Sequence, residues 1–211
     1  PPFLCLVASG GHSHIVRVQD YTHFEVLGRT VDDAAGEAFD KVARVLGVGY
    51  PGGPKIDALA QNGDPKRYKL PDSRIKDAPL DFSFSGLKTA ALNLIHMHEQ
   101  KGESVDVPSL CASFSKAVSE MLVPRTMQAV KESGYRKLAI AGGVAANSRI
   151  RADFKAACEK LGATLYTPPL SLCGDNGAMI GSQGYYEFLA GTRAGQDLNA
   201  FATRSIEQSY E

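Results

Sequence analysis

The sequence has only four cysteines among 211 residues, too scattered to form a CxxC pair or a recognisable disulfide framework. Isolated cysteines of this kind are typical of proteins from a reducing compartment such as the cytosol. We therefore expect all four to be small core residues. They are Cys5, Cys111, Cys158 and Cys173.

The chain also lacks an excess of either charge, a long apolar run and a leader segment. Lysine plus arginine equals aspartate plus glutamate at 23 each, so a nucleic-acid partner would have to be met by a local basic patch. The longest apolar stretches, such as LAIAGGVAA, fall well short of the ~18 residues that a membrane span needs. No basic-plus-apolar leader opens the chain. These features predict a cytoplasmic protein that does not enter a membrane.

Several motifs of common enzyme classes are absent as well. None of the glycine turns SGGH (9–12), YPGGP (50–54) and AGGVAAN (141–147) matches GxGxxG or GxxxxGK[ST], which disfavours a dinucleotide-binding fold and a P-loop ATPase. The sequence has no HExxH, and His96 and His98 are two residues apart, so on a helix they would point to nearly opposite faces. His12 and His14 share one face of an expected strand, but two histidines alone make a poor metal site. These spacings therefore disfavour a zinc protease.

What the chain does contain is a mixed order of strands and helices, without repeats or low-complexity tracts. Apolar runs between turn residues predict strands at residues 3–8, 14–18, 81–85, 137–141 and 163–167. Helical periodicity predicts helices at 32–46, 87–100, 109–133 and 178–189 and a further one ending at 161, with Pro124 expected to kink or divide the helix at 109–133. Residues 47–54 and 61–79 are expected to be loops. The chain enters a strand almost at once and has no initiator methionine, which suggests a fragment.

Three glycine turns and one acidic turn are candidates for chemistry. SGGH (9–12), YPGGP (50–54) and AGGVAAN (141–147) could offer backbone amides to a phosphate, although each turn alone is more often structural. In SLCGDNGAMIG (171–181), Asp175 precedes an expected helix and lies among glycines. An acid there is explained about equally well by helix capping and by chemistry.

Two further segments carry charges whose purpose is open. In helix 32–46, Phe39 belongs to an apolar face, and an acidic stripe follows the other side past Gly36. That stripe could be a solvated face or could approach ribose hydroxyls or a cation. In DFSFSGLK, Ser85 is a natural N-cap, and Lys88 lies in the first helical turn, where a cation needs a compensating anion. The stripe consists of Asp33, Glu37, Asp40 and Arg44.

Together these stretches resemble one family. SGGHSHIV, GRTVDDAAGEAFDKVARVLGVGYPGGPKID, DFSFSGLKTA, LAIAGGVAANSRIR and CGDNGAMIG, in this order, are similar to the TsaD family of tRNA threonylcarbamoyltransferases, formerly described as glycoproteases. The resemblance runs from about residue 3 to 181. It implies the α/β fold shared by actin-like ATPases, sugar kinases and Hsp70 (ASKHA), which has two related halves. Residues 1–190 would be the second half with helical insertions and 191–211 a tail, the first half being absent from this chain.

The resemblance also implies a reaction and a set of site residues. The family transfers a threonylcarbamoyl group from threonylcarbamoyl-adenylate to N6 of the adenosine 3′ of certain tRNA anticodons. Its metal is expected to be Fe or Zn, with Asp175 as one ligand and two histidines of an HxxxH motif as the others. No HxxxH occurs here, so the isolated chain is expected to be inactive. The implied contacts to ATP or the acyl-adenylate are Val7, Ala8, Ser9, Gly10, Gly11, Asp40, Gly53, Asp57 and Asn147.

Implied partners are tRNA and, in a bacterium, a TsaB-like paralogue and a TsaE-like ATPase. A basic stretch within residues 65–79 could meet tRNA, although acids dilute it and an ordinary solvated loop is nearly as good an explanation. Two other functions stay open: an ASKHA sugar or acid kinase, and a non-catalytic nucleotide-binding scaffold. The basic residues are Lys66, Arg67, Lys69, Arg74 and Lys76.

Overall fold

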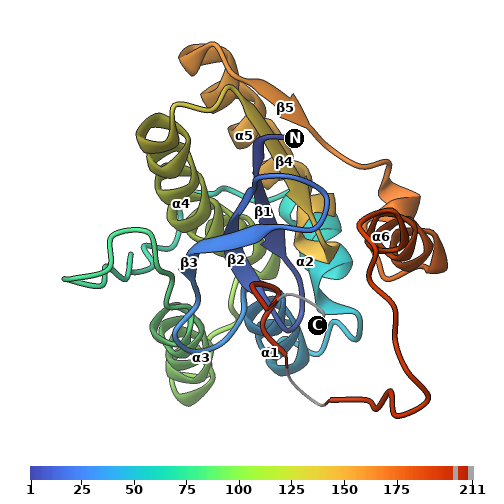
Figure 1. Cartoon of the computed structure of the whole chain (residues 1–211). Helices are drawn as coiled ribbons and strands as arrows, with labels where there is room; N and C mark the ends of the chain where they lie inside the picture. The colour runs from blue at the N-terminus through green and yellow to red at the C-terminus, as the bar shows by residue number, and fades with distance from the viewer. Residues whose placement is uncertain (202–203, 209–211) are drawn as a thin grey trace.

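The computed structural model describes residues 1–201 and 204–208, so positions 202–203 and 209–211 of the predicted tail lie outside the described residues. Its described part contains a mixed five-stranded sheet in the order β3-β2-β1-β4-β5 (Figure 1). The strands β1 (Phe3–Ala8), β2 (Ser13–Val18) and β3 (Phe24–Arg29) form an antiparallel meander. The strands β4 (Lys137–Ala141) and β5 (Thr164–Tyr166) add to β1 in parallel.

The described helices are α1 (Ala35–Val45), α2 (Gly52–Ala60), α3 (Ser85–Gln100), α4 (Val107–Ser133), α5 (Ser148–Leu161) and α6 (Gly177–Leu189), with short 3₁₀ turns η1 (Gly143–Ala146) and η2 (Leu170–Leu172). Five of them, α1 to α5, lie between the strands in the chain and pack on one face of the sheet, and α6 follows the last strand. Among the described residues, no helix is long and apolar enough to cross a membrane.

The hydrophobic core lies between the sheet and helices α1 to α5. Alternate residues of β1, such as Leu4 and Leu6, point into it because side chains alternate across a strand. Phe39 of α1 meets Phe114 of α4 edge to face, with ring centroids 5.3 Å apart. No residue of α6 belongs to this core, and none of its residues is buried.

The prediction that the cysteines are core residues is confirmed for three of the four. Cys111, Cys158 and Cys173 are buried, Cys5 is half-buried, and all four are free thiols. Burial raises the pKa of Cys5 to about 12 and that of Cys111 to about 11.

Several predicted elements need correction. Strand β3 and helix α2 lie where no strand or helix was expected, and α2 begins inside the predicted 47–54 loop. The strand expected at 81–85 is wrong: Phe82 forms one isolated bridge with Thr30, and α3 starts at Ser85.

Pro124 does not divide α4, which runs unbroken through it. A proline cannot donate a backbone hydrogen bond, and its ring weakens the preceding turn. Two side chains add hydrogen bonds to the turn before the proline: the Arg125 guanidinium donates to the carbonyl of Met121 at 2.8 Å, and the Thr126 hydroxyl donates to that of Leu122 at 2.8 Å.

Candidate adenylate site

Two of the glycine turns lie side by side at one edge of the sheet. They follow β1 and β4, which are parallel neighbours with Val7 opposite Ala141, so both turns leave the sheet at the same end. Gly142 adopts φ 90°, and a Cβ there would collide with the carbonyl of Ala8. The close approach of the two turns therefore requires glycine at this position.

The N-terminus of α1 packs onto the first turn. The amide of Gly36 donates to the carbonyl of Ser9 at 3.0 Å, and a Cβ on Gly36 would lie 2.6 Å from that oxygen. Glycine destabilises a helix interior relative to alanine, but here the close contact with the Ser9 backbone leaves no room for a side chain. The Ser9 hydroxyl accepts from the amide of His12 at 3.1 Å, while Gly10 and Gly11 are exposed, with open space where side chains would be.

Asp40 fixes the start of α2. Its Oδ1 accepts from the amide of Gly52 at 2.7 Å, and Gly52 in turn packs against Ala43. The neighbouring Gly53 has open space around its Cα. Asp40 and Arg44 line a cavity of about 290 Å³.

At the start of α5, one polar group is buried without a partner. Asn147 Oδ1 caps the helix by accepting from the amide of Ile150 at 3.0 Å, and Asp57 accepts from the hydroxyl of Ser148 at 2.7 Å. Asn147 is 7% exposed, and its Nδ2 has no hydrogen-bond partner among the described residues. Because buried polar groups in native proteins are almost always paired, this amide is suited to donate to a ligand.

Helix α6, which follows the turn with Asp175, is capped by the neighbouring asparagine and not by the acid. Asn176 caps α6 by accepting from the amide of Met179 at 3.1 Å. Asp175 is exposed and makes no hydrogen bond or ion pair with the described residues. The capping explanation for Asp175 is therefore wrong.

The described residues do not form a metal site by themselves. Nowhere in the described part of the chain do three or more His, Cys, Asp or Glu side chains lie close enough to hold an ion. An uncommitted carboxylate such as Asp175 suits a divalent cation, but one carboxylate does not retain it.

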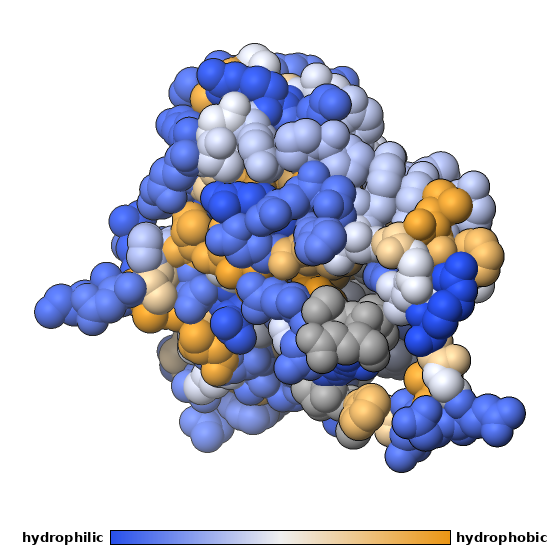
Figure 2. Space-filling view, in the orientation of Figure 1, coloured by the Kyte–Doolittle hydropathy of each residue, from blue (hydrophilic) through white to orange (hydrophobic). Residues whose placement is uncertain are grey.

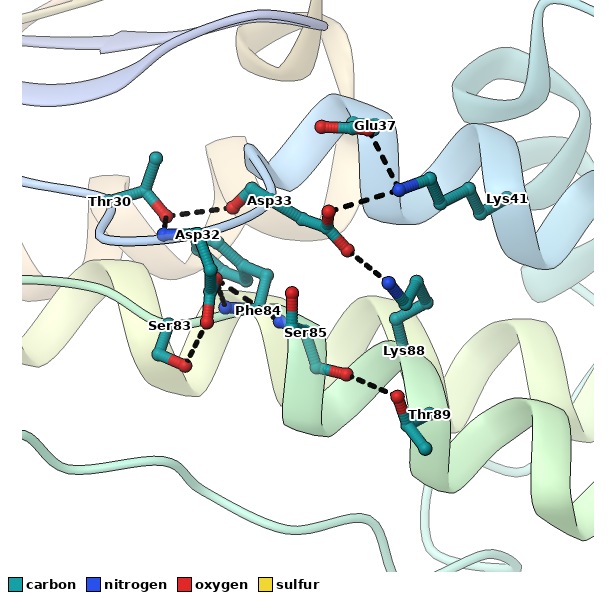
Figure 3. Close-up of polar contacts among 10 residues, drawn as sticks. All are labelled: Thr30, Asp32, Asp33, Glu37, Lys41, Ser83, Phe84, Ser85, Lys88 and Thr89. Atoms are coloured by element: carbon teal, nitrogen blue, oxygen red, sulfur yellow. Dashed lines mark hydrogen bonds and ion pairs between the residues drawn. The ribbon is translucent and has the colours of Figure 1, made fainter.

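Below the α1 turn, a pair of adjacent acids joins α1 to α3 (Figure 3). The Asp33 carboxylate lies between Lys88 at 2.5 Å and Lys41 at 3.0 Å, and Lys41 also reaches Glu37 at 2.8 Å. Burial alone would raise the pKa of Asp33, but hydrogen bonds from Lys88 and Lys41 outweigh burial and lower it. The anion that Lys88 needs is Asp33.

Asp32, the other acid of this pair, caps α3. It accepts from the amides of Phe84 at 2.8 Å and Ser85 at 3.2 Å and from the hydroxyl of Ser83 at 2.5 Å. The expected cap by Ser85 is therefore wrong, because Ser85 is already the first helical residue. No sequence signal points to Asp32, since its partners are about fifty residues away in the chain.

The structure thus gathers most of the implied site residues but not all of them. Turn η1 contacts β1, α1 and α2, which places the two glycine turns, Asp40 and Gly53 in one region. Asp57 bonds to Ser148, the residue after Asn147, at the start of α5, which contacts η1. No contact among the described side chains joins Asp175 to these residues.

Comparison with known proteins identifies the family to which the chain is similar. Residues 1–182 match the family model described as TsaD, tRNA N6-adenosine threonylcarbamoyltransferase. A protein of that name from Clostridium botulinum strain 657 is 52% identical over 200 residues, which is 95% of this chain and 59% of the relative. One from Clostridioides difficile strain 630 is 46% identical, covering 99% of this chain and 62% of the relative. The chain thus spans about three fifths of these relatives' length.

Solved structures show the fold. Full-length HypF in its phosphate- and nucleotide-bound form superposes with a TM-score of 0.66 at 15% identity, covering 88% of this chain and 33% of HypF. HypF from T. kodakarensis gives 0.55 at 20% identity, covering 76% and 21%. These likenesses confirm the predicted ASKHA fold class. The match of the family model over residues 1–182 establishes that the chain belongs to the tRNA N6-adenosine threonylcarbamoyltransferase (TsaD) family.

Proposed function

We propose that this chain provides the adenylate-binding part of an enzyme that transfers threonylcarbamoyl from threonylcarbamoyl-adenylate to N6 of the adenosine 3′ of the tRNA anticodon. The observation that carries the proposal is the unpartnered amide of Asn147, buried at a helix N-terminus beside two glycine turns. Helix N-termini and glycine-turn amides favour phosphate groups. Family membership favours acyl transfer over phosphoryl transfer and over a passive scaffold.

The chemistry asks mainly for orientation. The N6 amine attacks the carbamoyl carbon, the bond from that carbon to the phosphate oxygen breaks, AMP leaves, and the amine releases a proton. Since the acyl group is already activated, no nucleophilic serine or cysteine is needed. Gly10 is exposed and its amide would hold an anionic oxygen, whereas the amide of Gly11 donates to the Ser9 hydroxyl at 3.3 Å. The carboxylates of Asp40 and Asp57 would accept from hydroxyl groups.

We further propose that Asp175 is one of the ligands of a divalent metal, Fe or Zn, in the complete protein. When bound, such an ion supplies Lewis-acid stabilisation of developing negative charge. Asp175 suits this role because its carboxylate is exposed and is not needed to cap α6. The histidine ligands that the resemblance implies would come from outside this sequence.

The basic stretch within residues 65–79 is a candidate surface for tRNA, and its backbone is fixed by contacts to the rest of the fold. Although it has no regular secondary structure, α4 fixes it: the amide of Asp64 donates to Ser109 at 3.0 Å, the amide of Tyr68 donates to Ser113 at 3.2 Å, and Arg125 donates to the carbonyl of Ser73. Its five basic side chains are all exposed. We propose that this surface contacts tRNA phosphates. Partners of the TsaB and TsaE kinds stay predictions from the resemblance.

Asn147→Ser tests the adenylate site. Serine keeps an oxygen that can cap α5 but removes the amide donor, so unfolding free energy should change by less than about 0.5 kcal/mol. Binding of ATP and of a non-hydrolysable threonylcarbamoyl-adenylate analogue, measured by calorimetry, should weaken about tenfold, the usual worth of one hydrogen bond. Asn176→Ser makes the same change at the cap of α6 and should leave affinity unaltered. Equal ligand affinity of the two variants would show that Asn147 does not contact the adenylate.

A further inference from the structure

The face of the sheet that looks away from the core is apolar. Phe3 and Cys5 of β1 lie directly opposite Val18 and Val16 of β2, and Val7 lies opposite Ala141 of β4. All of them line one cavity of about 800 Å³. An apolar sheet face normally packs against another layer, whereas here a cavity remains, which Ser205, Ile206 and Gln208 of the tail also line.

Helix α6 is the element that stands over this face, yet it does not pack on it. Figure 1 shows α6 at the right of the view, apart from the other helices, and Figure 2 shows apolar surface gathered on that side. Its Met179 and Ile180 line the cavity but are 52% and 72% exposed. Its few ties to the sheet region include a stack of Tyr186 on Tyr21, with ring centroids 3.9 Å apart.

The cavity is poorly suited to bind a small ligand. Ligand sites need polar groups free to orient the ligand. Here Gln183 already donates to the carbonyl of Tyr21 at 3.0 Å and to Glu187 at 2.9 Å, and Thr192 donates to Glu187 at 2.8 Å. Protein interiors are close-packed, so an apolar space of this size between two apolar elements favours closure.

The sequence before α6 contains a joint at which closure could occur. Arg151 of α5 holds the preceding segment by donating to the carbonyl of Pro168 at 2.7 Å and contacting the buried Sγ of Cys173 at 3.2 Å. Between Cys173 and the start of α6 only GDN remains, and both Gly174 and Gly177 have open space around them. Arg151 thus holds the backbone up to Cys173, whereas beyond it the side chain of Asn176 bonds to the carbonyl of Gly174 at 3.0 Å and accepts from the amide of Met179 at 3.1 Å, both within the joint and its helix.

We propose that α6 swings at this GDNG joint and closes onto the apolar sheet face, filling the cavity with Met179 and Ile180. The joint contains Asp175, so closure sets the direction of its carboxylate relative to the glycine turns. This consequence for Asp175 rests on the proposed function, whereas closure itself does not.

Ile180→Ala tests closure on the chain itself. If α6 stayed open, Ile180 would remain a surface residue, and its truncation would change the unfolding equilibrium constant by less than about threefold. Closure buries it, so the constant should rise about 30-fold or more, as for other buried isoleucines, in urea unfolding curves. Leu189→Ala is the matched control, because Leu189 is 61% exposed and does not line the cavity. It should have little effect.

Two outcomes would overturn the proposal. One is an Ile180→Ala effect no larger than that of Leu189→Ala. The other is an effect that grows with protein concentration, because it would mean that a second copy covers the face. Cys5→Ala supplies a further check: with closure, its effect and that of Ile180→Ala should be non-additive, since the two side chains then touch.

Discussion

Asp175→Ala is expected to lower tRNA threonylcarbamoylation by about a hundredfold or more while leaving the fold intact. A group that stabilises charge developing in the transition state is typically worth several kcal/mol. The carboxylate bonds to no described residue, so its loss should cost less than about 0.5 kcal/mol of stability. The measurement needs a protein of full family length, made by joining this chain to the segment of the Clostridium botulinum relative that it does not match, hereafter the joined protein.

Asn176→Ala is the control for this experiment. It removes the cap of α6 and should therefore cost about 1 kcal/mol of stability, with little change in turnover per folded molecule. Thermal unfolding and nucleoside analysis of tRNA on the same preparations separate the two effects. Full activity of Asp175→Ala would show that this acid has no part in the reaction.

Asp33→Asn is expected to destabilise the chain by about 2 kcal/mol, because it leaves the mostly buried Lys88 without a counter-charge and Lys41 with Glu37 alone. Asp33 and Lys88 are only 14% and 18% exposed, so solvent screens the pair weakly. Glu120→Gln, which breaks the exposed pair with Lys116, should cost no more than about 0.5 kcal/mol.

The same variant carries a pH signature. The pKa of Asp33 is lowered in the folded chain, so its contribution to stability is present above the unfolded value of 3.8 and is lost as pH falls through the folded pKa. The difference in unfolding free energy between wild type and Asp33→Asn should therefore shrink below about pH 3.8. A difference that stays constant from neutral pH down to pH 3 would show that the ion pair does not hold α1 to α3.

The sequence predicts those parts of the fold whose signals are local. Strands β1 and β4 are short apolar runs next to glycine turns, and both lie at the expected residues. Strand β3 was missed because FEVLGR mixes glutamate, glycine and arginine, as an edge strand with one exposed side can. Helix α2 was missed because GGP reads as a turn, although a proline in the first helical turn lacks only a hydrogen bond that is not needed there.

The site shows the same division between local and distant signals. The glycine turns were visible from the sequence because their composition is unusual. The cap of α3 by Asp32 and the pairing of Asp33 with Lys88 were not, since both join residues about fifty positions apart. The alternation of Phe82 and Phe84 suggested a strand, but both rings are buried for packing and only one bridge forms. Such facts belong to tertiary structure, which local patterns do not contain.

Threonylcarbamoyl transfer by the joined protein tests the proposed function most directly. The protein would be given threonylcarbamoyl-adenylate and unmodified tRNA, together with TsaB-like and TsaE-like partners, and digested tRNA would be analysed by mass spectrometry. The account predicts N6-threonylcarbamoyladenosine next to the anticodon, with far less of it from the Asn147→Ser variant at sub-saturating adenylate. A folded joined protein that binds the adenylate but leaves the tRNA unmodified, while the intact Clostridium botulinum relative modifies it under the same conditions, would contradict the account.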